Sequence, residues 1–238
     1  MCRLPFVAVI FIVLCAACNS VNNDKNAFPL TKEDSLKHNI QTLKDSCKEG
    51  DLLVRLSDEL ISERIRYLNE KDFSFSHAGV IVMHNNQKMV CNINPDFAGA
   101  DTIRFEPIDS FINPKKNIVC GLYRYNLPPV EIDAFVGELN RFHKIGTRFD
   151  NLYDLTTDST MYCTEMIYKA LKRAAGDNMP IKTSLVPPKA IQMVAIFFKG
   201  KIPKEEVAKR PIISLDNLYL NPICREVMRF KLKIFPGE

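Results

Sequence analysis

The order of apolar patterns along the chain most constrains its fold. Short strand-like runs fill the first half, and longer helical runs dominate the second half. The expected strands are 52–56, 77–83, 88–93, 102–105 and 117–125, and the expected later helices begin at Pro128-Pro129, Cys163 and Pro187-Pro188. Strands followed by helices are typical of α+β proteins. We therefore expect an antiparallel sheet or half-barrel packed against helices.

Local signals refine this outline. Asn85-Asn86 favours a hairpin turn between the second and third strands. Ser57 is a candidate N-cap for an additional helix that carries Leu60 to Leu68. The segment 215–233 is expected to wrap the core without contributing chemistry.

The N-terminus resembles an export signal. Arg3 precedes the apolar stretch 4–14, which is too short to span a bilayer, and the small residues before Cys18 resemble a bacterial lipobox, although Cys15 stands where leucine is more usual. We expect a signal peptide at 1–17, a lipidated tether at 18–40 and one hydrolase-type domain at 41–238, with an extension from about 200. Lipid on Cys18 would anchor the protein to a membrane of the cell envelope, facing the periplasm or at the outer membrane. An ordinary cleaved signal peptide or an uncleaved anchor is the alternative.

The charge is nearly balanced. The chain has 32 basic and 28 acidic residues, a formal charge of +4. This balance gives no support for a nucleic-acid partner.

Five cysteines lie beyond the signal region and Cys18: Cys47, Cys91, Cys120, Cys163 and Cys224. If Cys163 is a free thiol, the other four allow three disulfide pairings, and Cys91 and Cys120 are also candidates for plain core thiols. No CxxC or matching histidine spacing occurs among the five, so we expect no metal site. No cofactor is expected either.

Cys163 is the strongest candidate for chemistry. It opens an amphipathic run that ends at Gly176, and the N-terminus of a helix favours a thiolate. His77 opens a strand far upstream, and such a pair is typical of cysteine hydrolases. The alternative is that Cys163 is a small buried hydrophobe.

Five motifs occur in an order that resembles a known family. They are Gly50-Asp51, His77-Ala78-Gly79, Gly146 to Asp150, Tyr162-Cys163-Thr164-Glu165 and Val186 to Ala190. On these residues the chain resembles the YiiX/YaeF-like branch of the NlpC-type permuted papain-like cysteine hydrolases. The resemblance implies that fold, with the histidine strand preceding the cysteine helix.

The resemblance also implies a Cys163–His77–Asn92 triad. Relatives carry glutamate on the strand after the histidine, and the matching position here is Asn92, which would orient the imidazole through its amide oxygen. The alternative for Asn92 is a surface strand residue, and Asp96 and Glu106 are alternative carboxylates without the expected spacing.

Further roles follow from the same resemblance. His77 would hold the Cys163 thiolate as an ion pair and then protonate the leaving amine. The helix-start N–H groups of Cys163 or Thr164 would face the oxyanion, with a second donor from Tyr162 or near Asp51. Glu165 is expected to be structural or to bind a substrate amine.

Three functions remain open at this point. The first is an amidase or peptidase acting on small peptides or cell-envelope fragments. The second is a lipid acyltransferase or thioesterase on the same scaffold, and the third is a non-catalytic ligand-binding lipoprotein.

Overall fold

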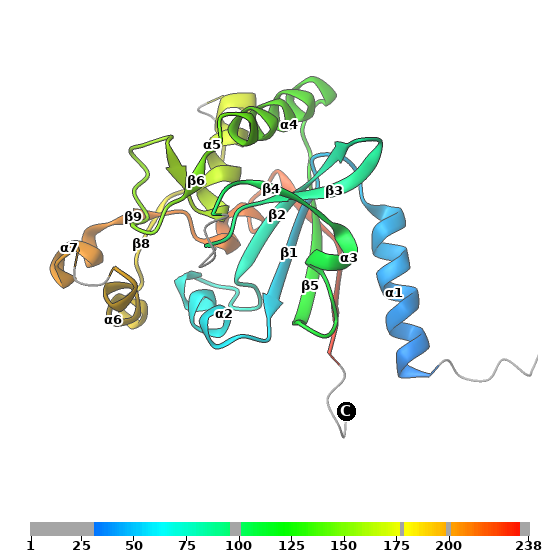
Figure 1. The fold of residues 1–238 in the computed structure, drawn as a ribbon, viewed down its shortest axis with the longest axis horizontal. Helices are drawn as coiled ribbons and strands as arrows, with labels where there is room; N and C mark the ends of the chain where they lie inside the picture. The colour runs from blue at the N-terminus through cyan, green and yellow to red at the C-terminus, as the bar shows by residue number, and fades with distance from the viewer. Residues whose placement is uncertain (1–30, 96–100, 177–178, 199–200, 234–238) are drawn as a thin grey trace, which may run out of the picture.

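The computed structural model describes residues 31–95, 101–176, 179–198 and 201–233. Within them the chain forms a six-stranded sheet in the order β10-β5-β1-β2-β3-β4, and all neighbouring strands are antiparallel (Figure 1). The strands are β1 Leu52–Ser57, β2 His77–His84, β3 Gln87–Asn92, β4 Arg104–Pro107, β5 Asn117–Tyr125 and β10 Cys224–Lys231. The sheet is open, with β10 and β4 at its edges. The expected α+β class with an antiparallel sheet is confirmed.

The hairpin between β2 and β3 forms where the sequence predicted it. Asn85 and Asn86 have positive φ angles of 49° and 60°. Asparagine tolerates this conformation, and two such residues in succession match the twist of the flanking strands. The hairpin fixes the register that places β3 beside the start of β2.

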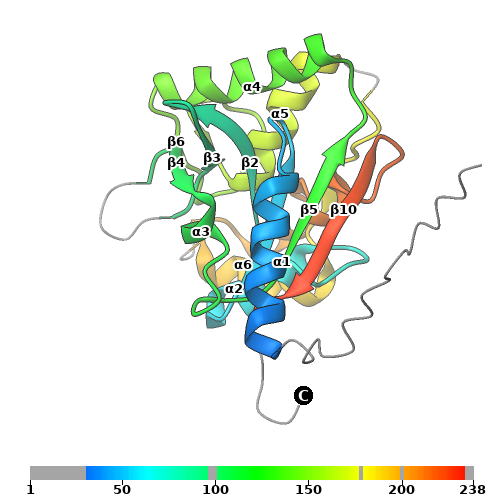
Figure 2. The same ribbon diagram turned by 90° about the vertical axis from the view of Figure 1, so that its right-hand side faces the viewer.

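Helices cover both faces of the sheet. On one face, α4 (Pro129–Lys144) and α5 (Cys163–Ala175) bury Phe135, Leu139 and Ile167 against the sheet. On the other face, α1 (Lys32–Ser46) and the short α3 (Ile108–Phe111) pack against a second apolar cluster. Figure 2 shows α1 in front of the sheet and α4 across its top. The sheet is therefore the central layer of the molecule.

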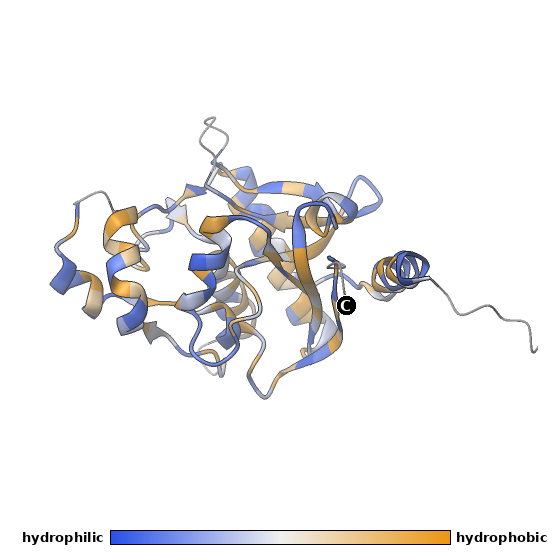
Figure 3. Cartoon of the chain, turned by 90° about the horizontal axis from the view of Figure 1, so that it is seen from below, coloured by the Kyte–Doolittle hydropathy of each residue, from blue (hydrophilic) through white to orange (hydrophobic). Residues whose placement is uncertain are grey.

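The tether predicted at 18–40 extends too far along the chain, because its last residues belong to helix α1. Helix α1 begins at Lys32 and is capped by Thr31, whose hydroxyl oxygen accepts from the N–H of Asp34. Leu36 and Ile40 pack toward the sheet, and Figure 3 shows hydrophobic residues of α1 on the side facing the body. Apolar residues at helical spacing within a polar segment explain the error. The signal peptide, Cys18 and residues up to 30 lie outside the described residues.

A third, smaller cluster lies beside the sheet. Helix α6 (Pro188–Phe197), α7 (Lys204–Lys209) and the 3-10 turn η1 (Arg66–Leu68) enclose it. Helix α2 (Leu60–Ile65) starts later than predicted, because Ser57 is still paired in β1 and Glu59 occupies the N-cap position. The remaining short elements are β6 Arg148–Phe149, β7 Thr160–Met161, β8 Ser184–Leu185, β9 Pro211–Ile212 and the 3-10 turn η2 Leu215–Leu218.

The C-terminal extension does more than wrap the core. It supplies β10, which pairs with β5 along the sheet edge, and β9 and η2. None of the helices in the described ranges has the length and apolar character needed to cross a bilayer.

Candidate active site

Cys163 is the first residue of α5, as the sequence predicted. Helix α5 packs against β2, and the backbone N–H groups of Ala78, Thr164 and Cys163 itself act to lower the pKa of the Cys163 thiol. The first N–H groups of a helix have no partner within the helix, so they are available to a thiolate or an oxyanion. The thiol therefore lies directly beside the start of β2.

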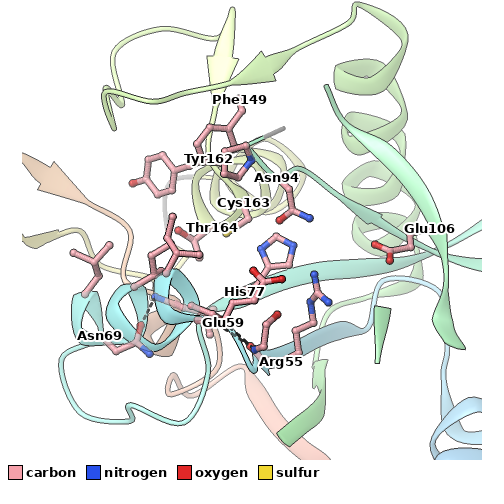
Figure 4. Close-up of a pocket in the computed structure, with 18 of the residues that line it drawn as sticks. Arg55, Glu59, Asn69, His77, Asn94, Glu106, Phe149, Tyr162, Cys163 and Thr164 are labelled. Carbon is pink, nitrogen blue, oxygen red and sulfur yellow. Dashed lines mark hydrogen bonds between the residues drawn. The ribbon is translucent and has the colours of Figure 1, made fainter. Parts of the chain in front are cut away.

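His77 opens β2 and lines the same cavity as Cys163. Its side chain is 9% exposed. In Figure 4 the imidazole lies on the side of the cavity that holds Cys163 and Asn94. Within the described residues, no hydrogen bond joins the sulfur directly to the ring. Catalytic hydrogen bonds are often long before substrate binds, so this geometry is compatible with a catalytic pair.

Asn92 contacts His77, as the resemblance implied. The amide nitrogen Nδ2 donates to the carbonyl of Val90 and to Oε2 of Glu106, both at 3.2 Å. These two acceptors fix the amide orientation and leave Oδ1 facing Nε2 of His77 at 3.5 Å. An amide oxygen only accepts, so Nε2 carries the proton and the neutral ring leaves Nδ1 free to accept one. Glu106 thus acts on His77 through Asn92, and Asp96 lies outside the described residues.

Burial acts against the expected thiolate–imidazolium pair. Burial raises the pKa of Cys163 to about 11, although the three N–H groups and Arg55 oppose the shift. Burial, with Arg55 and Arg104 nearby, lowers the pKa of His77 well below its usual value, against the effect of the hydrogen bond that His77 donates to Asn92. Desolvation disfavours both charged forms. Burial therefore favours the thiol and the neutral imidazole over the ion pair.

The cavity around the pair has a volume of about 490 Å³ and a mixed lining. One part is apolar and includes Ile61, Ile65, Leu68, Phe149, Ile212, Ile213 and Leu215. The other part is charged and includes Arg55, Glu59, Arg104, Glu106 and Lys116. The C-terminal segment, in which the sequence showed no chemistry, therefore supplies part of the cavity wall.

Tyr162 and Thr164 also line the cavity, but their side chains bind protein backbone. The Tyr162 hydroxyl accepts from the N–H of Ile213 at 2.8 Å, and the Thr164 hydroxyl donates to the carbonyl of Ile213 at 2.6 Å. Both contacts attach the C-terminal segment to the start of α5. The backbone N–H of Thr164 remains the better oxyanion donor.

Glu165 is fully buried, consistent with the structural alternative. One carboxylate oxygen accepts from the N–H of Tyr162 at 3.2 Å, and the other lies 2.8 Å from Nζ of Lys169. Burial raises the pKa of Glu165 to about 7 despite Lys169. The residue caps the helix that carries Cys163 and does not line the cavity.

Asp51 is not part of the site, which corrects the expectation of a donor near it. Its carboxylate receives two hydrogen bonds from Arg124, at 2.6 and 2.7 Å, and one from the N–H of Lys48 at 2.7 Å. With 1% exposure it is enclosed at the other end of β1. Asp51 anchors the start of β1 instead.

The cysteines of the described ranges are all free: Cys47, Cys91, Cys120, Cys163 and Cys224. Cys47, Cys91 and Cys120 are core thiols, so none of the three possible pairings occurs. Within the same ranges, no three His, Cys, Asp or Glu side chains cluster in a way that could hold a metal ion.

Sequence reasoning missed the charged lining of the cavity. Arg55 is the direct cross-strand partner of His77, and Arg104 is that of Asn92. Strand alternation alone cannot reveal these neighbours, because the register between strands must be known first.

A half-buried thiol at a helix start, beside a histidine strand that precedes it in the chain, defines a permuted papain-like site on an antiparallel sheet. Residues 46–198 match the model of the family described as permuted papain-like amidase enzyme, YaeF/YiiX, C92 family, and the chain belongs to this family. The resemblance drawn from the sequence motifs is thus confirmed.

The fold also occurs among solved structures. The crystal structure of the metalloprotein YiiX from Escherichia coli O157:H7 matches with a TM-score of 0.61 and 18% identity, covering 77% of this chain and 97% of that one. Among curated proteins, no significant match was found.

Proposed function

We propose that this chain is a cysteine amidase that cleaves amide or peptide bonds in small peptides or cell-envelope fragments. The membership in a papain-like amidase family supports a hydrolase. The observation that carries the proposal is that Cys163, the first residue of α5, lines the same cavity as His77.

The proposed reaction starts from the neutral pair. Nδ1 of His77 accepts the thiol proton as the sulfur of Cys163 attacks the substrate carbonyl carbon. The developing oxyanion is stabilised by backbone N–H groups at the start of α5, including that of Thr164. His77 then gives the proton to the leaving amine, and water, activated by His77, hydrolyses the thioester.

Asn92 and Glu106 position the imidazole in this scheme. Glu106 accepts from the Asn92 amide, and Asn92 in turn accepts from Nε2–H of His77. A negative charge at the far end of this chain favours the imidazolium that forms during attack. Glu106 would therefore supply, through Asn92, the charge that the triad position itself lacks.

The apolar part of the cavity favours a second candidate, an acyl-transfer or thioesterase reaction on lipids. The same nucleophile would serve both reactions, and the acyl chain would lie along the apolar wall. Activity on peptide and amide substrates compared with activity on acyl lipids distinguishes the two reactions.

The test compares wild type with Cys163→Ala on peptidoglycan stem peptides, aminoacyl amides and acyl lipids. The proposal expects turnover of peptide or amide substrates by wild type and none by the variant. Turnover of acyl lipids alone favours the second candidate. Binding without turnover of any class, or unchanged turnover by Cys163→Ala, contradicts the assignment of a cysteine hydrolase.

We also propose export and lipid attachment at Cys18, which would bring the enzyme to envelope substrates. In a bacterial host, radiolabelled palmitate should enter the wild-type chain and not the Cys18→Ser variant. Equal labelling of both, or of neither, contradicts the anchor.

A further inference from the structure

Two arginines flank the proposed catalytic residues on adjacent strands. Arg55 on β1 pairs in register with His77 on β2, and Arg104 on β4 pairs in register with Asn92 on β3. Directly paired residues of antiparallel strands project from the same face. All four side chains therefore project from the same face, and both arginines line the cavity that contains Cys163.

Arg55 is held rigidly but keeps an unmatched charge. Its Nη1 donates to the carbonyl of Phe111 at 3.1 Å and to Oδ1 of Asn117 at 3.2 Å, and the guanidinium lies over the Phe111 ring at 4.6 Å. The Nε atom is buried without a partner. Among the described residues, no carboxylate lies within ion-pair distance of Arg55. The partners of Arg55 thus fix its direction without neutralising it.

Arg104 is even less engaged. In the described ranges its side chain makes neither a hydrogen bond nor an ion pair, although it lines the cavity. The carboxylates of Glu59 and Glu106 share the cavity, but neither approaches Arg55 or Arg104 closely enough for an ion pair. Glu106 is instead bound to Asn92.

The charged residues of the cavity act on one another and on His77. Glu106 and Glu59 favour the charge on Arg55 from beyond ion-pair distance, Arg104 disfavours it, and both arginines disfavour protonation of His77. Unneutralised charges in a partly buried site are stabilised when an anion binds, and guanidinium groups match carboxylates in geometry.

We propose that Arg55 and Arg104 bind a carboxylate of the substrate beside Cys163, so that the preferred substrates are amides carrying a carboxylate next to the cleaved bond. This inference rests on the proposed amidase function and names its substrate class. The bound carboxylate would also offset the two positive charges near His77. The imidazolium needed for attack would then form more easily with the correct substrate in place.

The test uses two alkylating probes that differ only in charge. Iodoacetate carries a carboxylate and iodoacetamide a neutral amide; with both, the Cys163 thiolate displaces iodide and forms a carbon–sulfur bond. Mass spectrometry of the Cys163 peptide gives both rates, and the same ratio in urea-unfolded protein provides the reference. The ratio of iodoacetate to iodoacetamide rates should be at least about tenfold higher in the native protein, the order expected for a hydrogen bond to a charged group.

Variants assign the effect to the arginines. Arg104→Gln and Arg55→Gln should each return the ratio toward the unfolded reference, while Arg225→Gln, which removes an exposed charge on β10 outside the cavity, should leave it unchanged. Arg104 makes no hydrogen bond or ion pair with any residue that the structure describes, so its variant keeps the test decisive if Arg55→Gln does not fold. A native ratio no higher than the reference, or one that Arg104→Gln leaves unchanged, overturns the proposal.

The same assay separates this inference from the proposed function. His77→Ala should slow both probes without altering their ratio. If it leaves both rates unchanged, the catalytic assignment fails, whereas the ratio still reports on the arginines.

Discussion

Replacing Glu106 by glutamine tests whether the negative charge of Glu106 affects His77 through the hydrogen bonds of Asn92. The substitution keeps the size of the side chain and an oxygen that can accept from Nδ2 of Asn92, now 3.2 Å away. What it removes is the negative charge. The hydrogen bond would therefore persist in its neutral form.

The magnitude follows from these contacts. A hydrogen bond to a charged group contributes about 1.5–3 kcal/mol and a neutral one about 0.5–1.5 kcal/mol, so the exchange removes about 1 kcal/mol. The effect reaches the imidazole through a 3.5 Å contact, which weakens it. A loss of up to 1 kcal/mol corresponds to a decrease of about threefold to fivefold in rate.

The assay is the rate of Cys163 alkylation by iodoacetamide as a function of pH, which needs no known substrate. Glu106→Gln should lower the rate at neutral pH by that factor, with little change in thermal stability. Glu59→Gln is the matched control, because it removes the same charge from the same cavity and is not bonded to Asn92. If both variants slow alkylation equally, the net charge of the cavity explains the result and the route through Asn92 is refuted. An unchanged rate in Glu106→Gln refutes it as well.

Three further predictions concern stability. Asp51→Asn should lower the free energy of unfolding by about 3 kcal/mol in chemical denaturation, because it leaves Arg124 without its carboxylate. The rate of Cys163 alkylation in the folded protein should not change. A changed rate would show that Asp51 does contribute to the site. The pKa of His77 is lowered on folding, so protonation favours the unfolded chain. Stability should be full above pH of about 6.5 and fall below it by up to about 1.4 kcal/mol per pH unit. His77→Asn should remove this decline, while the exposed His38→Gln should keep it. Gly79→Ala should lower the melting temperature, since its Cβ would lie 2.4 Å from a β3 side chain and 3.0 Å from β3 backbone; an unchanged melting temperature would show that the two strands separate at little cost.

Much of the fold could be predicted because its signals are local. Strand β5 coincides with the predicted range 117–125, and α5 begins at Cys163 and ends before Gly176, whose φ is 82°. Helical spacing, proline starts and asparagine turns act over a few residues, so they can be read without knowing the fold. The errors occur where tertiary contacts override a local signal. Ser57, for example, pairs within the sheet as part of β1 instead of capping a helix.

Two details of the proposed site were beyond local reasoning. Glu106, which the sequence offered only as an alternative carboxylate without the expected spacing, accepts a hydrogen bond from Asn92 from the neighbouring strand β4. The protonation state of Cys163 and His77 depends on burial, which outweighs the helix N-terminus that the sequence made visible.

The sequence by itself determined the elements of this protein, the family motifs, and the placement of one thiol at a helix start and one histidine at a strand start. These follow from spacing and capping along a continuous piece of chain. The contacts between distant parts of the chain depend on the tertiary structure: Arg55 and Arg104 flank Cys163 and His77, Asp51 is bound by Arg124 away from them, and burial disfavours the charged forms of both Cys163 and His77. Strand register and exclusion of water join residues far apart in the chain, and no local pattern encodes them.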